Sequence, residues 1–421
     1  MPINRPSNMQ LSEAFACHAH KLKAYQDMWQ YPLVQNPERL ENIYPAHWLT
    51  TMAEVPLPEI SEAFWRGPDT TWPQDFAKFY HWAMSPVPDQ IISHNNLGID
   101  SNRGFSQNLS PKKRYEIETL SQWCRHHFPS TGTEIKRSTS NNTTNVQELR
   151  RGLDIAGGRG HLASRLNACG YKMTSIDWDQ RLQTEGDKNY GLFAPQYLNY
   201  NILESDLKKI YQAHHFTVGL HTCGSLALQH LQQSWQGQIN HILNLGCCYD
   251  KFSRKNNEWG NKYDYLDICE NGRHLASRFH PIPSATPNAT IYRYALMLWL
   301  KKKGMKGPTA MGRPKKQWLK NCFGTYAIAY LNKIGIEHHW SKHEINDFIQ
   351  KKTIEDEIRR YAVANLIRTL IGRPIEIYLI MQRALILEEK GYSVKLIYMF
   401  DPQVSPRNIA IYAQKNCPDE P

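Results

Sequence analysis

The spacing of hydrophobic and polar positions changes at Gly152, and this change separates two kinds of predicted structure. Before it, residues 1–105 place their apolar and aromatic side chains at helical intervals, most clearly over residues 12–29 and 74–84. No catalytic motif is visible in this part of the chain. We therefore predict a mainly helical N-terminal region over residues 1–105.

A further helix is predicted over residues 112–128, directly before the change. Ser110 is a suitable N-cap for it, and Pro111 occupies the first helical position, where its missing N–H costs nothing. The following stretch, residues 130–147, is rich in Ser, Thr and Asn and has few apolar residues. Such a composition is typical of a loop.

From Gly152 onward, short apolar runs alternate with helical patterns, which predicts a mostly parallel sheet. Each predicted strand ends near a polar or glycine-containing turn. The predicted strands cover residues 152–154, 172–176, 197–202, 217–220 and 239–245, with helices over residues 161–169 and 226–233.

Residues 254–374 interrupt the alternation with mainly helical patterns, and we interpret them as a basic insertion. The alternation resumes with a helix over 375–390 and strands over 393–400 and 408–413. Two strands joined by a short turn must run antiparallel. This reversed terminal hairpin distinguishes a methyltransferase sheet from an ordinary dinucleotide-binding sheet. We therefore predict a Rossmann-like α/β fold of the class I methyltransferase type, built from residues 106–253 and 375–421.

A glycine-rich loop follows the first predicted strand, in the segment Leu153-Asp154-Ile155-Ala156-Gly157-Gly158-Arg159-Gly160. In such sheets ligands bind at the carboxyl ends of the strands, where Gly157, Gly158 and Gly160 allow the backbone to approach closely. Asp177 ends the second strand, where its carboxylate can accept hydrogen bonds from both ribose hydroxyls. Asp154 suits a cationic ligand and would repel a pyrophosphate. The pattern therefore favours S-adenosylmethionine over NAD.

Catalytic candidates follow the fourth and fifth strands, because methyl transfer mainly requires a positioned nucleophile and, where needed, removal of its proton. His221 is the leading candidate for cofactor contact or general base, and a histidine that only bonds the backbone is an equal alternative. Cys223 and Cys248 fit packing or pocket lining better than a zinc site, because their spacing does not match a usual zinc knuckle. A covalent nucleophile is less favoured still, because the Pro-Cys context of such enzymes is lacking. Tyr249 and Lys251 are further candidates to face the substrate. No metal is predicted.

Charge and cysteine content narrow the class of partner and compartment. The net charge of +11 favours a polyanionic partner, and residues 301–320 hold eight Lys and Arg residues without one acid. The charge therefore suggests a nucleic acid as partner, and a plain solvated surface is an equal alternative. Nine irregularly spaced cysteines fit reduced thiols, and neither a signal peptide nor a membrane span is evident. We expect a cytoplasmic protein.

Five separated segments resemble the methyltransferase-like protein 25 group over most of residues 108–415. They are Ser110-Pro111-Lys112-Lys113-Arg114-Tyr115-Glu116-Ile117, the glycine loop with Gly160-His161-Leu162, Gly219-Leu220-His221-Thr222-Cys223-Gly224, Gly246-Cys247-Cys248-Tyr249, and Phe400-Asp401-Pro402 with Ser405-Pro406-Arg407-Asn408. The His-x-Cys-Gly and Cys-Cys segments also resemble a tRNA 2'-O-methyltransferase family, which implies RNA as the substrate class.

Two positions depart from the family pattern. Ala156 stands where the family has a glycine, and it should be tolerated if its φ is negative. Ser225 stands where the family has an aspartate. The complete set of predicted cofactor-binding residues is Asp154, Gly157, Gly158, Gly160, Asp177, Trp178, Asn201 and His221. The predicted substrate-binding residues are Lys112, Lys113, Arg407, Lys315 and Lys316.

Overall fold

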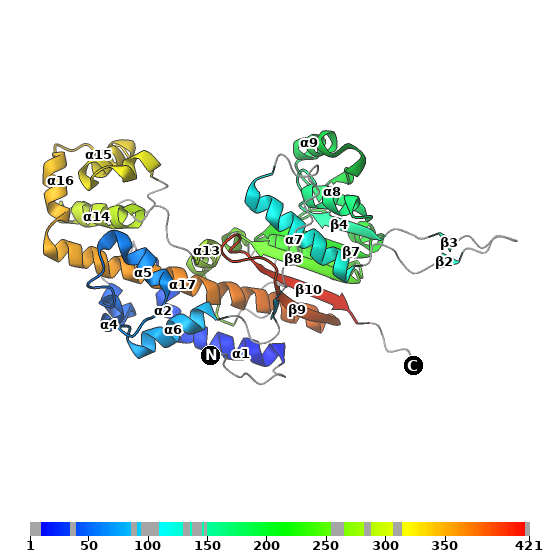
Figure 1. Cartoon of the computed structure of the whole chain (residues 1–421), viewed down its shortest axis with the longest axis horizontal. Helices are drawn as coiled ribbons and strands as arrows, with labels where there is room; N and C mark the ends of the chain where they lie inside the picture. The colour runs from blue at the N-terminus through cyan, green and yellow to red at the C-terminus, as the bar shows by residue number, and fades with distance from the viewer. Residues whose placement is uncertain are drawn as a thin grey trace. The chain divides into compact units, whose positions relative to one another are not determined.

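The computed structural model describes residues 10–33, 39–85, 91–93, 109–128, 135–136, 145–146, 150–253, 265–281, 288–305 and 314–416. The chain folds into two compact units (Figure 1). The first contains residues 1–21, 86–268 and 376–421, and the second contains residues 22–85 and 269–375. The chain passes from the second unit into the first within helix α17 (Lys352–Glu389).

The first unit is built on an eight-stranded sheet with the order β1-β9-β10-β8-β7-β4-β5-β6. All neighbouring strands are parallel except where β10 pairs with β8 and β9. The strands are β1 (Ile91–Ser93), β4 (Arg151–Ile155), β5 (Lys172–Asp177), β6 (Gln196–Asn199), β7 (Phe216–Cys223), β8 (His241–Cys247), β9 (Tyr392–Tyr398) and β10 (Ile409–Lys415). The short edge strand β1 lies in the region predicted to be helical. The other strands confirm the predicted Rossmann-like fold.

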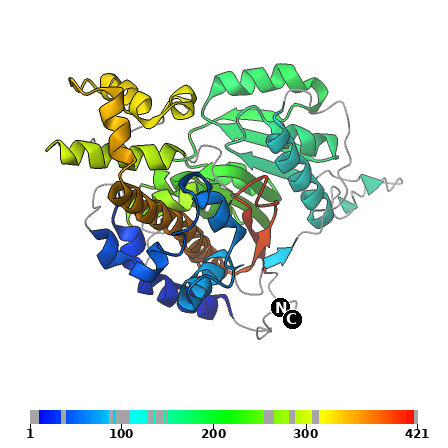
Figure 2. The same cartoon turned by 60° about the vertical axis from the view of Figure 1, so that its left-hand side comes forward.

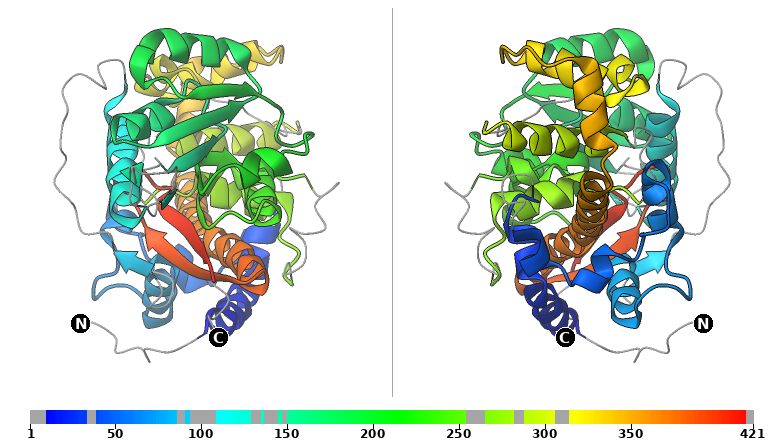
Figure 3. Two further views of the ribbon diagram at one scale, coloured as in Figure 1. Left: turned by 90° about the vertical axis from the view of Figure 1, so that its right-hand side faces the viewer. Right: turned by 90° about the vertical axis from the view of Figure 1, so that its left-hand side faces the viewer.

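The reversed terminal hairpin is confirmed. β10 runs antiparallel to β9 over Ile409 to Lys415 and antiparallel to β8 over Ile411 to Gln414. The last described strand therefore lies inside the sheet. Figures 2 and 3 show the red hairpin beside the green strands of the same twisted sheet.

Helices cover both faces of this sheet because the strand side chains alternate in direction. Val218 of β7 packs in one core cluster with residues of α7 (Pro111–His127) and α8 (His161–Ala168). The neighbouring Thr217 instead bonds His230 and Ser234 of α11 (Ser225–Gln236), on the opposite face. Further helical segments of this unit are α1 (Leu11–Ala24), which extends past its boundary, α9 (Gln180–Tyr190), η4 (Gly191–Phe193), α10 (Lys208–Gln212) and η5 (Tyr249–Lys251).

The start of α7 follows the predicted capping pattern. The Ser110 hydroxyl accepts a hydrogen bond from the Lys113 amide, and Pro111 is the first residue of the helix. Residues 130–147, predicted to be a loop, contain a small antiparallel pair formed by β2 (Ile135–Lys136) and β3 (Asn145–Val146). The rest of that stretch lies outside the described residues.

In its described residues, the second unit consists of helices and the segments that connect them. They are α2 (Gln26–Gln30), α3 (Leu40–Ile43), α4 (Ala46–Leu49), η3 (Leu57–Glu59), α5 (Ile60–Arg66), α6 (Gln74–Met84), α13 (Glu270–Arg278), α14 (Asn288–Lys302), η6 (Lys316–Lys320), α15 (Phe323–Lys333), α16 (Lys342–Ile349) and the first part of α17. Stacked aromatic side chains, such as Trp48 on Phe76 and Trp72 on Phe76, fill part of its core. None of the described helices has the length and apolar character needed to cross a membrane.

The predicted boundary between the insertion, which was to end at 374, and a helix beginning at 375 is wrong. One helix, α17, runs through Pro374. Gly372 does not end it either, because a Cβ there would lie 2.5 Å from the Leu275 carbonyl oxygen. This glycine permits close packing against α13 and does not serve as a helix stop.

Candidate functional site

The glycine loop between β4 and α8 has little room for side chains. A Cβ on Gly157 would lie 2.2 Å from the Ser175 hydroxyl and 2.6 Å from Asp154 Oδ2. Gly158 and Gly160 have φ of +57° and +70°, a region in which glycine carries no steric penalty. Close contacts at Gly157 and positive φ at Gly158 and Gly160 therefore favour glycine at these three positions.

Ala156 does not meet the condition under which we expected it to be tolerated. Its φ is +56°, in the left-handed region, which costs an alanine roughly 1–2 kcal/mol. His221 and Cys248 share this conformation, with φ of +61° and +47°. Five non-glycine residues of the described chain have positive φ. Ala156 follows β4, His221 lies near the end of β7, and Cys248 follows β8, so these three are at the carboxyl ends of neighbouring strands. Backbone strain that clusters in this way is typical of a functional site.

Asp177 fixes the loop from the neighbouring strand β5. Its carboxylate accepts hydrogen bonds from the Gly158 amide and from the Asp179 amide, each at 2.9 Å. Because each carboxylate oxygen has two lone pairs, both can still accept a ligand hydroxyl. The side chain is nearly buried and lines the larger cavity described next.

A cavity of about 710 Å³ opens beside the ends of β4, β5 and β7. Five predicted site residues line it: Asp177, Trp178, Asn201, Cys223 and Lys251. Trp178 is 72% exposed, which is unusual for so large an apolar side chain, and Tyr200 beside it is also exposed. Ser225 lines the cavity as well, and its hydroxyl accepts a hydrogen bond from the Ser253 amide at 2.9 Å.

A second cavity, of about 260 Å³, lies on the other side of Ala156, which lines both cavities. The predicted residues Lys113, Asp154, Gly157, Gly158 and His221 line it. The fold therefore brings nearly all predicted cofactor residues to two adjoining cavities. Gly160 instead serves as the N-cap of α8.

Asp154 is buried beneath the second cavity. Within the described part of the chain, its Oδ2 has no hydrogen-bond partner. Burial raises the pKa of Asp154 to about 7, and the nearby Asp177 charge adds to this effect. Lys113 lines the same cavity, and burial together with the Arg159 charge lowers its pKa. An unused acceptor atom on a buried carboxylate is costly, so this position is unusual for a group without a ligand role.

His221 is held by a carboxylate from a distant part of the sequence. Its Nε2 lies 2.9 Å from Oε2 of Glu116 on α7. Burial raises the pKa of Glu116, but the hydrogen bond and charge of His221 outweigh burial and lower it. His221 lies at the strand end as predicted, whereas no role for Glu116 was expected from the sequence.

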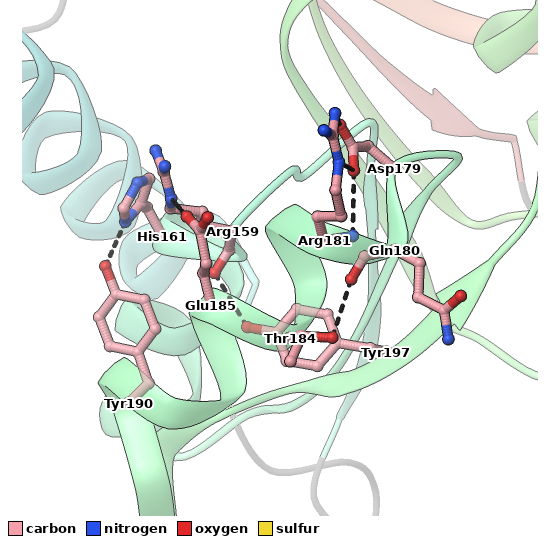
Figure 4. A network of polar contacts seen from close by, with 9 residues as sticks. All are labelled: Arg159, His161, Asp179, Gln180, Arg181, Thr184, Glu185, Tyr190 and Tyr197. Atoms are coloured by element: carbon pink, nitrogen blue, oxygen red, sulfur yellow. Dashed lines mark hydrogen bonds and ion pairs between the residues drawn. The ribbon is translucent and has the colours of Figure 1, made fainter.

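Side chains of α9 and β6 also hold the glycine loop and the start of α8, and no role was predicted for these partners. His161 Nδ1 contacts the Tyr190 hydroxyl, Arg159 pairs with Glu185, and the Tyr197 hydroxyl donates to the Arg159 carbonyl (Figure 4). Burial and the Lys113 and Arg159 charges lower the pKa of His161 to about 4, which keeps it neutral near pH 7. His161 lines the smaller cavity, and its place directly after Gly160 could have indicated this.

Tyr249 and Arg407 do not face a substrate in this structure, contrary to expectation. Tyr249 is fully buried, and its hydroxyl donates to Glu376 Oε1 at 3.3 Å. Arg407 Nη1 lies 2.8 Å from Glu376 Oε2, also in a buried position. The Arg383 guanidinium lies 5.1 Å from the centre of the Tyr249 ring. These residues join η5, α17 and the hairpin turn, so their role is structural.

The remaining predicted substrate contacts lie on surfaces. Lys112 is exposed, and its Nζ lies 3.7 Å from Glu116 Oε1. Lys315 and Lys316 belong to the second unit, where the Lys315 ammonium lies 5.6 Å from the Trp318 ring centre. Lys306 and Arg313 of the basic segment lie outside the described residues. Whether Lys112, Lys315 and Lys316 contact RNA remains a prediction.

The part of the chain that carries the glycine-loop site is similar to a known family of domains. A family model described as a methyltransferase domain matches residues 112–255. This range begins in α7, contains β4 to β8 and includes both cavities, so the match falls on the candidate site itself. Residues 112–255 are a methyltransferase domain.

Proposed function

We propose that the cofactor is S-adenosylmethionine. The observation that carries this proposal is the buried Asp154 carboxylate, whose Oδ2 has no hydrogen-bond partner among the described residues. A cationic ammonium group at the smaller cavity would satisfy this atom. The carboxylate of Asp177, in the larger cavity, would accept from ribose hydroxyls. Trp178 offers an exposed ring for a base. When bound, the cofactor supplies an electrophilic methyl group.

The fit is supported by the shape of the loop. Gly157 leaves no room for a side chain between Ser175 and Asp154, so the loop backbone lies close to the cavity floor. Ala156 lines both cavities and lies between the Asp154 and Asp177 ends of the site. Lys113, in the smaller cavity, is available for a carboxylate. The donors and acceptors therefore match an amino acid joined to a nucleoside.

Titration calorimetry with adenosylmethionine and with its demethylated product tests the cofactor. We expect binding of both, lost in Asp177→Ala and weakened in Asp154→Asn. Asp187→Ala, an acid of α9 outside both cavities, serves as the control and should bind normally. Absence of binding to the wild-type protein would refute the cofactor proposal.

We further propose that the substrate is RNA. This class is supported by the net charge of +11, by the basic residues of 301–320 and by the resemblance of two segments to a tRNA 2'-O-methyltransferase family. His221 is the proposed proton acceptor. Its Nε2 is occupied by Glu116, so Nδ1 is the nitrogen that could take a substrate proton.

Incubation with labelled adenosylmethionine and total RNA from cells lacking the protein tests the substrate. Label should enter RNA and should fall strongly when Lys315 and Lys316 are replaced by Gln. Label entering only protein or small molecules would instead identify a different methyltransferase class. Cofactor binding without any transfer would indicate a non-catalytic module.

A further inference from the structure

Three cysteine sulfurs meet at the carboxyl ends of β7 and β8. Cys223 Sγ lies 3.1 Å from Cys247 Sγ, and the sulfurs of Cys223, Cys247 and Cys248 all lie within 4.8 Å of one another. All three are free thiols. Among the described residues, this is the group with metal-ligand atoms at such separations. Sequence spacing alone had favoured packing or pocket lining for these residues.

The strand register brings the first two sulfurs together. Cys223 and Cys247 are direct partners in the parallel pairing of β7 and β8. The Gly224 amide donates to the Cys247 carbonyl at 3.0 Å, which holds the two strand ends against each other. A Cβ on Gly224 would lie 2.3 Å from the Lys251 carbonyl oxygen, so this turn also packs tightly on η5. The cluster is therefore set by backbone contacts on both sides.

A strained backbone brings the third sulfur to the cluster. In a continuing strand, Cys247 and Cys248 would point to opposite faces of the sheet. Cys248 has φ of +47°, in the left-handed region, and this turn breaks the alternation. Its sulfur consequently lies on the same side as the other two. A non-glycine residue in this conformation costs about 1–2 kcal/mol, which indicates that the position of this thiol is functionally required.

We propose that Cys223, Cys247 and Cys248 bind a zinc ion, with a fourth position left for water or a substrate atom. Three thiolates at Zn–S distances of about 2.3 Å would place the sulfurs roughly 3.8 Å apart, close to the observed arrangement. Soft sulfur ligands select zinc over magnesium or calcium. Three protein ligands and one open position are typical of a catalytic zinc site and not of a structural one.

The thiol cluster lies at the larger cavity. Cys223 lines the larger cavity together with Asp177 and Lys251. The metal would therefore lie at the same sheet edge as the methyltransferase site. The Lys251 ammonium, on the same cavity wall, would balance the net negative charge of one zinc ion and three thiolates.

Metal analysis of the full-length protein, purified without a histidine tag and dialysed against Zn²⁺ and then buffer, tests the proposal. We expect about one zinc per chain and an at least fivefold lower content in each of Cys223→Ser, Cys247→Ser and Cys248→Ser. Cys169→Ser removes a partly buried thiol outside the cluster and should retain full zinc content. Because this readout needs no methyl transfer, it is independent of the proposed substrate.

Replacement of the metal by Co²⁺ covers the case in which a variant fails to fold. Wild-type protein loaded with Co²⁺ should show a thiolate-to-cobalt charge-transfer band and the strong visible absorption of tetrahedral cobalt. A wild-type protein that takes up neither metal would overturn the proposal. So would equal zinc content in the cluster variants and the wild type, or a Cys223–Cys247 disulfide in protein purified under reducing conditions.

Discussion

The Nε2 atom of His221 lies 2.9 Å from Glu116 Oε2, and this contact joins β7 to α7. If His221 takes a proton in the reaction, Glu116 holds its ring and stabilises the charged form. We expect His221→Gln to lower kcat by roughly 10²- to 10³-fold and Glu116→Gln by a smaller factor. The double variant should be no slower than His221→Gln alone.

Single-turnover kinetics of the wild type, the two single variants and the double variant provide the measurement. The cofactor affinity of each protein is measured by calorimetry. The cofactor Kd should stay within about twofold in all of them, because neither side chain is proposed to carry the cofactor's charge. Additive losses in kcat would show that the two residues act separately.

The raised pKa of Asp154 predicts that the stability of the free protein depends on pH. Burial moves this pKa from 3.8 to about 7 in the folded state, so the folded protein binds more protons than the unfolded chain between these values. The free energy of unfolding should therefore fall as the pH rises through this interval. Chemical denaturation should show this fall in the wild type and a smaller one in Asp154→Asn.

The same carboxylate predicts the opposite trend for cofactor binding. A cationic ligand requires ionised Asp154, so binding should tighten by up to about tenfold per pH unit below pH 7 and level off above it. Calorimetry in buffers of different ionisation enthalpy should detect proton release below pH 7. A pH-independent affinity in the wild type would argue that Asp154 does not meet the cationic group.

Trp178 should contribute to cofactor affinity and not to folding. Its ring is 72% exposed at the cavity, so Trp178→Ala should leave the Tm nearly unchanged. Loss of a stacked base should weaken binding by about 1–3 kcal/mol, which is roughly five- to hundredfold in Kd. Leu192→Ala is the matched control, because Leu192 is fully exposed and lines neither cavity. Equal affinities of the two variants would contradict a stacking role.

Ala156→Gly should stabilise the protein, although glycine is usually destabilising. The φ of +56° costs alanine more than the added chain entropy of glycine, so a net gain of about 0.5–1 kcal/mol is expected. Ala77→Gly, inside α6, is the control and should destabilise by about 0.5–1 kcal/mol. Thermal unfolding of both variants distinguishes them by the sign of the Tm shift.

The Glu376 carboxylate should be far more important for stability than a surface acid. Glu376→Gln removes the charge that compensates buried Arg407, and such a loss costs about 3–5 kcal/mol. Glu185→Gln, in the half-exposed pair with Arg159, should cost less than about 1 kcal/mol. Similar Tm values for the two variants would show that the buried pair is not a stabilising contact.

The parts of the fold that depend on local patterns could be predicted from the sequence. The capped start of α7, the glycine loop and the terminal hairpin each have their determinants within a few residues. Helix α17 was divided in error because Gly372 and Pro374 are ordinary helix-ending signals. The close packing of Gly372 on the Leu275 carbonyl, which gives this glycine another purpose, depends on tertiary structure.

The candidate site was predictable in its positions but not in its pairings. Residues at strand ends gather at one sheet edge, which is why Asp177, Cys223 and Lys251 were all found to line one cavity. The partners of His221 and Tyr249 come from α7 and α17, and no local pattern links these helices to the strands. The thiol cluster depends on strand register and on one left-handed residue, and neither is evident from spacing.

The position of β10 has a consequence for folding during synthesis. β10 follows every other described strand of this sheet in chain order, yet it lies between β8 and β9. Until residues 409–415 emerge, β8 has an unpaired edge, and such edges are prone to pairing with other chains. The exposed edge of β8 is therefore a site of possible mispairing during synthesis, and it is covered only when β10 has joined the sheet.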